Sequence, residues 1–182
     1  MGGQPELLES ALSLSLYEAS IPVLIRTLKN LDSFLDKAVA HAEETGTDLS
    51  TYTDARLIED MHPLPRQIHM ASDGAKSAGA RLAGIEPPSM PDVEVTIPDL
   101  KARIARTIAF LETITPEQVD GDDERNIELK FPNRVMNFTA KAFLLTFAMP
   151  NFMFHVTTAY ALLRSKGVPL GKMDFLAGGQ AA

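Results

Sequence analysis

The stretch KAFLLTFAMPNFMFHVTTAYALLRSKG, from Lys141 to Gly167, decides which folds this chain can adopt. Between Ala142 and Leu163 it contains no Asp, Glu, Lys or Arg. A run of this length either spans a bilayer or forms a buried helix of a soluble bundle. Pro150 interrupts the run, and Asn151 and His155 place two polar side chains one helical turn apart.

The rest of the chain favours the buried helix over the membrane span. The apolar run would be the only span, and its polar side chains would have to find partners in hydrocarbon. The other helical segments are amphipathic and need an apolar surface on which to pack. We therefore predict that this segment is the most buried helix of a soluble bundle, and that the protein has no membrane partner.

Composition narrows the class of protein further. The 182 residues suffice for one domain with a hydrophobic core, and 45% of them are hydrophobic. A net charge of −7 and a pI near 5.1 argue against nucleic acid, because phosphate binding needs a basic surface. The chain has no cysteine, and its N-terminus lacks the pattern of a signal peptide. We predict a cytoplasmic protein.

Three segments show the apolar spacing of amphipathic helices, with steps that alternate between four and three residues. They cover about residues 20–44, 63–82 and 97–114. Pro22 is placed in the first turn of the first helix, where its missing N–H is tolerated. Thr96 is the expected N-cap of the third helix. The apolar stripes are Leu24, Leu28, Leu31, Leu35, Ala38 and Ala42; Leu64, Ile68, Ala71, Ala75, Ala78 and Leu82; and Ile97, Leu100, Ile104, Ile108 and Leu111.

A short alternating segment precedes the apolar helix. Asn126–Phe131 alternates apolar and polar residues, residues 132–134 form a turn, and residues 135–138 return as a second strand. Thr139 then caps the fourth helix, which Pro150 should bend or locally open. The predicted fold is all-α: a four-helix bundle with a small β-hairpin between helices three and four. Its parts are a loose leader (1–15), one bundle domain (16–176) and a tail (177–182).

The helix order, the hairpin and the ending HVTTAYALLRSKGVPLGKMDFL resemble the DinB-like (YfiT-like) superfamily of metalloenzymes. Within it, the chain is similar to an uncharacterised branch known only as a domain of unknown function. The resemblance covers most of residues 14–176, and it implies the fold more firmly than a function. The matching stretches are SLYEASIPVLIRTLKNL, ARLIEDMHPLPRQIHMASDGAK, RLAGIEPP and MPNFMFHVTTAYALLRSKGVPLGKMDFL.

The superfamily's metal site uses one histidine of helix two and an HxxxH pair of helix four. The resemblance places the second histidine of the pair at His155, the first at Asn151, and the helix-two ligand at Gln67. Neutral amides bind zinc or nickel poorly beside imidazole. We therefore predict a degenerate metal site without a tightly held metal. If one is bound, the resemblance implies a divalent ion such as zinc or nickel.

Each of these three residues also has a purely structural interpretation. His155 is alternatively a core histidine bonded to a backbone carbonyl or to Thr158. Asn151 alternatively satisfies backbone groups that Pro150 leaves unpaired. Gln67 is alternatively a buried hydrogen-bond partner.

Three further residues are additional candidates for the same site. His69 is expected nearer the outer face of helix two, where solvent surrounds it. Tyr17 and Asp60 precede helices one and two, and we expect them to line one end of the bundle. No catalytic residue is predicted.

Two functions follow from this pattern. The first is a non-catalytic bundle that binds a small molecule at the degenerate site. The alternative, implied by the resemblance, is a divalent-metal-dependent transferase or hydrolase acting on a small molecule. The resemblance also implies homodimerisation through a helix face.

Overall fold

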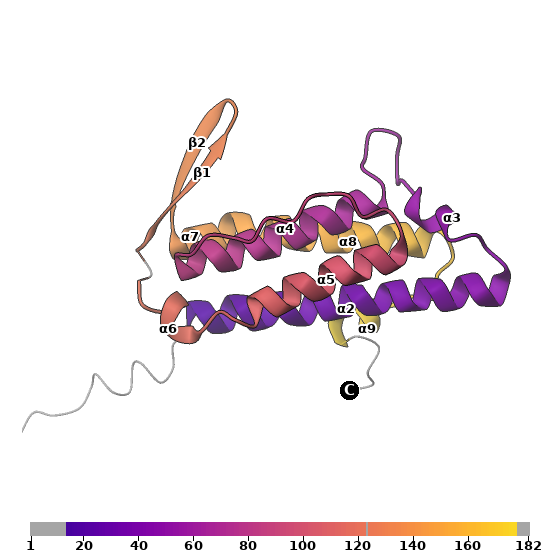
Figure 1. The fold of residues 1–182 in the computed structure, drawn as a ribbon, viewed down its shortest axis with the longest axis horizontal. Helices are drawn as coiled ribbons and strands as arrows, with labels where there is room; N and C mark the ends of the chain where they lie inside the picture. The colour runs from indigo at the N-terminus through magenta and orange to yellow at the C-terminus, as the bar shows by residue number, and fades with distance from the viewer. Residues whose placement is uncertain (1–13, 123, 178–182) are drawn as a thin grey trace, which may run out of the picture.

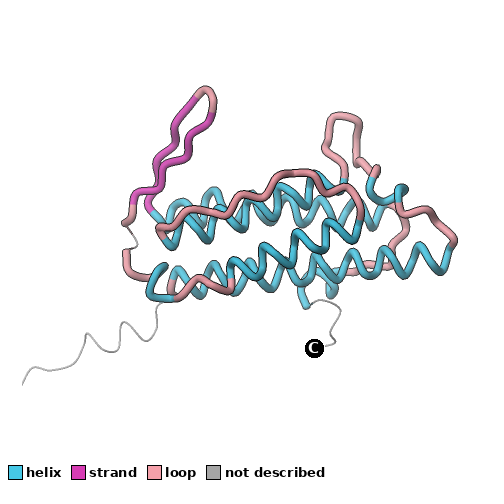
Figure 2. Tube along the Cα trace, in the orientation of Figure 1, coloured by secondary structure: helices cyan, strands magenta, loops and turns pink. Residues whose placement is uncertain are grey.

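The computed structural model describes residues 14–122 and 124–177, so most of the predicted leader and tail lie outside the described residues. Figure 1 and Figure 2 show one elongated bundle from which a β-hairpin projects at one end. The elements are α2 (Leu16–Thr45), α3 (Ser50–Thr53), α4 (Leu64–Ala83), α5 (Ile97–Leu111), α6 (Pro116–Val119), β1 (Asn126–Phe131), β2 (Arg134–Thr139), α7 (Ala140–Phe143), the π-helix η2 (Leu144–Ala148), α8 (Met149–Ser165) and α9 (Lys172–Ala177).

Four long helices form the bundle, which confirms the predicted fold class. Helix α4 packs against α8 and α5, and α2 packs against the same two helices from the other side. The three amphipathic stripes predicted from the sequence are almost entirely buried in the core between them. The fourth long helix is the nearly continuous helical segment formed by α7, η2 and α8.

Helix α2 begins earlier than its apolar stripe indicated. The Ser15 hydroxyl accepts a hydrogen bond from the Glu18 backbone N–H, and the Glu18 carboxylate accepts one from the Ser15 N–H, each at 3.1 Å. This capping box starts the helix at Leu16 instead of Ser20. Pro22 therefore lies inside the helix, and the prediction that it occupies the first turn was wrong.

A π-turn changes the register of the apolar segment. Pro150 has no N–H to give to the preceding turn, and the helix responds with a wider turn, in which the Met149 N–H donates to the Leu144 carbonyl five residues back. This confirms the local opening expected at Pro150. The extra residue rotates everything that follows. Helical spacing through the apolar segment predicts one stripe of Leu144, Phe147, Asn151, Phe154, Thr158 and Ala161. Leu144 and Thr158 are buried, but Phe154 is exposed and Ala161 is only partly buried. The observed buried face carries Leu144, Ala148, Phe152, His155, Val156, Thr158, Ala159, Leu162 and Leu163.

The most buried helix is α4, which corrects the expectation that the apolar helix would be central. Helix α4 buries 13 of its 20 residues, whereas α8 buries 7 of its 17. Leu145 and Phe154 are 58% and 56% exposed on the outer side of the apolar segment. By length and composition, residues 140–165 would also qualify as a membrane span, with a mean hydropathy of 1.2. One such helix is weak support for a span, because bundle helices pass the same test.

The hairpin forms where it was predicted, but its second strand is one residue longer at each end than expected, which leaves a two-residue turn. Phe131 pairs with Arg134 across Pro132 and Asn133, and the antiparallel register continues to the pair of Asn126 and Thr139. The Thr139 hydroxyl then accepts from the Ala142 N–H at 3.3 Å, which confirms its predicted role as the cap.

Two short helices were not predicted from the sequence, α6 and α9. Helix α9 closes the described chain against α2. Its Asp174 carboxylate lies 2.5 Å from the Lys37 ammonium, and the Asn30 amide donates to the Phe175 carbonyl at 2.8 Å.

The close packing of the end of α5 on α4 depends on Gly79 of α4. A Cβ atom at this position would lie 2.6 Å from Leu111 Cδ2 and 2.8 Å from Ile114 Cδ1. We expect Gly79→Leu to lower the free energy of unfolding by about 1–3 kcal/mol through overpacking. Helix propensity alone would raise the free energy of unfolding by roughly 0.5–1 kcal/mol. A lower free energy of unfolding would therefore come from the packing.

Chemical denaturation followed by circular dichroism measures this change. Arg26→Leu on the exposed face of α2 is the matched control and should alter stability by no more than about 0.5 kcal/mol. A Gly79→Leu protein as stable as the control would contradict the close approach.

Candidate functional site

His155 of α8 and Gln67 of α4 meet at the interface of the two helices. The His155 Nδ1 atom lies 2.9 Å from Gln67 Oε1, and the Gln67 Nε2 amide donates to the His62 carbonyl at 3.1 Å. His155 is 9% exposed and Gln67 is 2% exposed. Because the Gln67 nitrogen faces a carbonyl, its oxygen must face the imidazole and accept, so Nδ1 carries the proton.

The imidazole is neutral near pH 7. Burial lowers the pKa of His155 below its ordinary value, and the neighbouring His62 and Arg66 lower it further. A neutral ring with its proton on Nδ1 has a lone pair on Nε2. Among the hydrogen bonds of the described residues, none engages this Nε2 atom. His155 therefore offers one fixed, uncharged acceptor.

Asn151 lies one turn before His155 on α8 and also faces α4. Its Nδ2 atom lies 3.3 Å from the position that a Cβ atom would take at Gly74, so the glycine leaves room for the amide. Asn151 is partly exposed, and no side-chain hydrogen bond is described for it. The structural interpretation, in which Asn151 satisfies backbone groups opened by Pro150, is not supported by any described contact.

The structural interpretation of His155 needs a different partner from those expected. The Thr158 hydroxyl donates to the Phe154 carbonyl at 2.8 Å and does not bond to His155. Gln67 takes the place expected of Thr158 or a backbone carbonyl. The interpretation of Gln67 as a buried hydrogen-bond partner of the histidine agrees with this geometry.

The donor set at this interface does not fit a conventional divalent-metal centre. The Gln67 oxygen and the His155 Nδ1 atom bond to each other, which leaves one imidazole nitrogen and the neutral amide of Asn151. Zinc and nickel prefer imidazole, thiolate and carboxylate ligands. Within residues 14–122 and 124–177, no three His, Cys, Asp or Glu side chains converge on a point where they would hold an ion.

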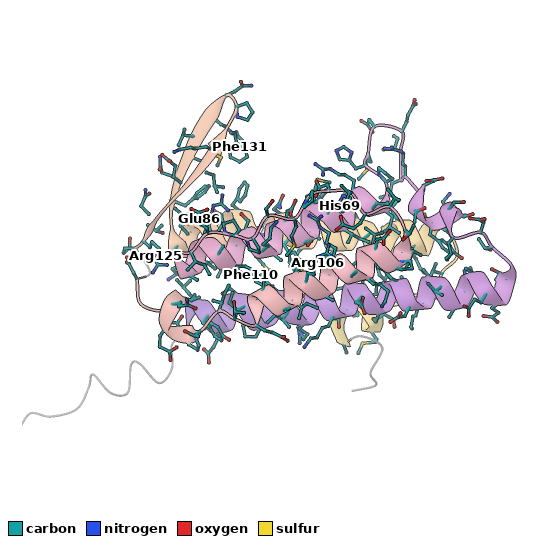
Figure 3. The ribbon with its side chains drawn as sticks, viewed as in Figure 1. His69, Glu86, Arg106, Phe110, Arg125 and Phe131 are labelled. Carbon is teal, nitrogen blue, oxygen red and sulfur yellow. The ribbon has the colours of Figure 1, made fainter. Side chains whose placement is uncertain are left out.

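His69 is not on the outer face of α4, which corrects the sequence prediction. It is 5% exposed, and Figure 3 shows it beneath the extended connection between α4 and α5, residues 84–96, which we call the crossing. Its Nε2 atom lies 3.4 Å from Glu94 Oε2 but makes no hydrogen bond among the described residues. Burial and the charge of Arg103 lower the pKa of His69, against the pull of two carboxylates, so the ring is neutral and this contact is no ion pair.

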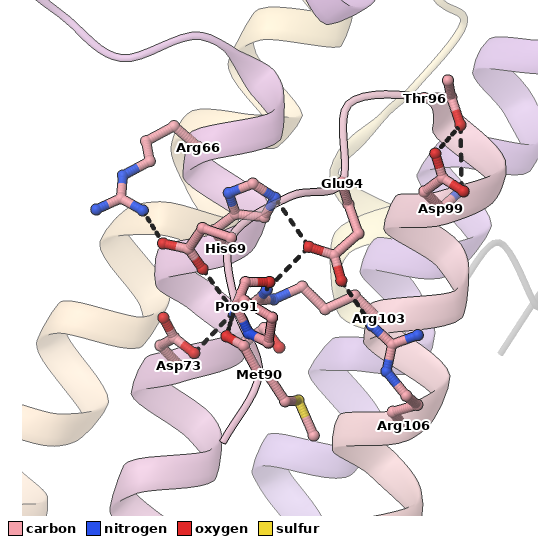
Figure 4. Close-up of polar contacts among 12 residues, drawn as sticks. Arg66, His69, Asp73, Met90, Pro91, Glu94, Thr96, Asp99, Arg103 and Arg106 are labelled. Carbon is pink, nitrogen blue, oxygen red and sulfur yellow. Dashed lines mark hydrogen bonds and ion pairs between the residues drawn. The ribbon is translucent and has the colours of Figure 1, made fainter. Parts of the chain in front are cut away.

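A buried ionic cluster surrounds His69 (Figure 4). Its centre is the guanidinium of Arg103, which is fully buried on α5. It lies 3.0 Å from Glu94 Oε2, 2.8 Å from Asp73 Oδ1 and 2.9 Å from Asp92 Oδ1.

Further contacts complete the cluster at its edges. The Arg103 guanidinium donates to the Pro91 carbonyl at 3.0 Å, and Arg106 lies 2.6 Å from the second oxygen of Glu94. Arg66 binds the second oxygen of Asp92. The pKa values of Asp92 and Glu94 lie below their ordinary range because hydrogen bonds and positive charge outweigh the opposing effect of burial.

Sequence reasoning missed this cluster, although one signal was present. Arg103 stands between Leu100 and Thr107 on the apolar side of its helix, where a charge needs buried partners. The crossing supplies Asp92 and Glu94, two acids separated by one apolar residue, as on an extended strand. Asp73, one turn after His69, supplies the third carboxylate.

Tyr17 and Asp60 lie far from each other, so the expectation that both line one end was wrong. The Tyr17 N–H donates to Asp120 Oδ1 at 2.7 Å, beside α6. Asp60 is exposed in the loop that precedes α4, at the opposite end of the bundle beside α3 (Figure 1).

Comparisons with known proteins agree with this architecture. The crystal structure of a DinB family member protein from Shewanella denitrificans matches with a TM-score of 0.83 and 35% sequence identity, over 92% of this chain and 95% of that one. No curated protein sequence matches the chain. The sequence profile of the family described as "Domain of unknown function (DUF1993)" matches residues 16–176. The chain therefore belongs to this family of unknown function and has the DinB-like helical-bundle fold that its sequence predicted.

Proposed function

We propose that this protein binds a small molecule through His155 at the interface of α4 and α8, without a bound metal ion. One observation carries the proposal: Gln67 holds the Nδ1 proton of His155 and leaves Nε2 as a neutral acceptor. A ligand hydroxyl or amide N–H would donate to this atom. The partly exposed Asn151 amide, one turn away, would supply a donor and an acceptor to the same ligand.

The hydrogen bond between Gln67 and His155 also supports a second candidate function. Metal-binding histidines are commonly oriented by a second-shell acceptor at their other nitrogen. His155 would then present Nε2 to a divalent ion, and the protein would be a metal-dependent transferase or hydrolase. The amides at the two other positions favour the metal-free function, because they offer a zinc or nickel ion no anionic or imidazole ligand.

Elemental analysis separates the two functions. We expect protein produced with added zinc and nickel, then dialysed, to retain far less than one divalent ion per chain. The double variant Gln67→His/Asn151→His places imidazoles at both amide positions and should retain zinc stoichiometrically. Stoichiometric metal in the natural protein that His155→Ala removes would establish the metal-dependent alternative instead.

Ligand binding tests the proposed function directly. In a fragment screen followed by NMR, we expect binders carrying a hydroxyl or amide donor to shift the His155 ring signals. Matched ethers, which cannot donate, should bind more weakly by roughly tenfold, the equivalent of one hydrogen bond. His155→Phe should abolish binding, followed for this variant through the NMR signals of the fragment. Equal binding of donors and ethers, or binding that survives His155→Phe, would contradict the role of Nε2.

The neutral state of the buried histidines predicts how stability depends on pH. The pKa values of His155 and His69 in the folded protein lie below the ordinary value of 6.5. At a pH between the folded and the unfolded pKa, the unfolded chain therefore binds more protons than the folded protein. The free energy of unfolding should therefore fall as the pH is lowered from about 6.5 to about 5. The carboxylates of Asp92 and Glu94, whose pKa values are lowered, add their own loss only at more acidic pH.

Urea denaturation at several pH values measures this dependence. The free energy of unfolding of the double variant His155→Gln/His69→Gln should change less with pH over this range than that of the natural protein. A natural protein whose stability is constant from pH 6.5 to 5 would show that the two rings are not held neutral.

Two further expectations are proposals without a contact in the structure to support them. We propose a homodimer and a cytoplasmic location, the first from the resemblance and the second from the composition. Nucleic acid remains an unexpected partner because of the charge of −7.

A further inference from the structure

A cavity of about 640 Å³ lies at the end of the bundle where α3, the start of α4 and the start of α5 come together. It is separate from the site at His155. On α4, Gln67 faces α8, whereas His69, two residues later, faces the crossing and lines the cavity. Successive positions on a helix point about 100° apart, so two residues on, the side chain faces a different neighbour.

The walls of this cavity are mainly apolar and rigid. Three prolines, Pro63, Pro65 and Pro98, line it together with Val95 and Ile97. Proline rings lose no side-chain entropy when a ligand packs on them. A volume of a few hundred Å³, apolar walls and a few polar groups describe a site for a small organic molecule.

The charged residues that line the cavity determine which charge a bound molecule should carry. Asp54, Asp92 and Glu94 line the cavity, and Arg66 is the cation among its lining residues. Asp92 and Glu94 are already paired with arginines of the ionic cluster. Asp54 is exposed, and its carboxylate makes no ion pair among the described residues. One carboxylate at the rim is therefore left without a counterion.

His69 contributes an uncharged polar side chain to the lining of the cavity. The ring is 95% buried, its Nε2 atom has no hydrogen bond among the described residues, and it lines the cavity. An anionic ligand would gain no positive charge from this ring.

The helix ends at the cavity do not reverse this preference. The N-terminus of a helix favours an anion, and both α4 and α5 begin here. The first turn of α5 already contains the carboxylate of Asp99, and the Thr96 hydroxyl accepts from the Asp99 N–H at 3.3 Å. The start of α4 lacks a side-chain cap, but Pro63 and Pro65 have no N–H, so its first turn presents only the N–H groups of Leu64 and Arg66 to an anion.

We infer that this cavity binds a small organic cation: an amine whose ammonium group pairs with Asp54 and whose apolar body packs on Pro63, Pro65 and Pro98. The ligand would make a charge-assisted hydrogen bond at the rim and bury its hydrocarbon in the cavity. This inference stands independently of the site at His155.

Three probes of the same shape and different charge test the inference. These are 2-phenylethylamine, 2-phenylethanol and 3-phenylpropanoate, followed by NMR shifts of the Val95 and Ile97 methyl groups. We expect saturable binding of the amine, weaker binding of the alcohol and none of the carboxylate. No binding of the amine, or binding of the carboxylate as tight as that of the amine, would overturn the inference.

Variants then locate the bound amine. Asp54→Asn should weaken amine binding by roughly tenfold to a hundredfold, because it removes a charged acceptor. Glu86→Gln makes the same charge change on an exposed residue outside the cavity and should have no effect. Val95→Trp, at an exposed lining position, should block the cavity.

One more variant keeps the two sites distinct. Amine binding should survive His155→Phe, which abolishes the proposed site at the interface of α4 and α8. An amine that binds Asp54→Asn as well as the natural protein, or whose binding is lost in His155→Phe, would place it elsewhere and refute this cavity as its site.

Discussion

The buried guanidinium of Arg103 is the interaction on which one side of this bundle depends. It is fully enclosed, and it binds carboxylates from α4 and from the crossing together with a backbone carbonyl of that crossing. Desolvation of such a charge costs several kcal/mol, which only close partners of opposite charge offset. The crossing, rich in proline and short of backbone hydrogen bonds, is thus held against two helices by side-chain charge. The cavity beside it takes its shape from the same contacts.

Helix α4 lies between two polar regions. Arg66 acts on both, because it binds Asp92 of the ionic cluster and its charge lowers the pKa of His155. The α4 stripe of small residues, Ala71, Ala75 and Ala78, is buried and lets the neighbouring helices approach. Gln67 bonds toward α8, while His69 faces the ionic cluster. Both regions hold a neutral imidazole, but for different reasons: a glutamine amide fixes the tautomer of one ring, and burial beside a guanidinium keeps the other uncharged. A rotation of α4 would therefore disturb both at once.

The sequence predicted what depends on repeated local pattern. Three stripes with a spacing of four and three residues located the helices, and the alternation of Asn126–Phe131 located the hairpin. The prediction for the apolar helix failed after Pro150, because a π-turn adds a residue to one turn and shifts every later position around the helix. Apolar composition also misjudged burial, since a helix on the side of a bundle can expose Leu145 and Phe154. Length and hydropathy cannot distinguish a central helix from a peripheral one.

Part of the candidate site was predictable from the resemblance. The resemblance placed Gln67 and His155 at corresponding positions of helices two and four, and their side chains meet in the structure. The predicted position of His69 was wrong, because the burial of this side chain depends on the path of the irregular connection between α4 and α5. That loop is placed by Arg103, whose partners are 9 to 30 residues away in sequence. A buried charge and its distant acids form a constraint that no periodic pattern contains. Where the apolar stripe of a helix includes an arginine, the search for its partners should therefore precede any assignment of the neighbouring histidines.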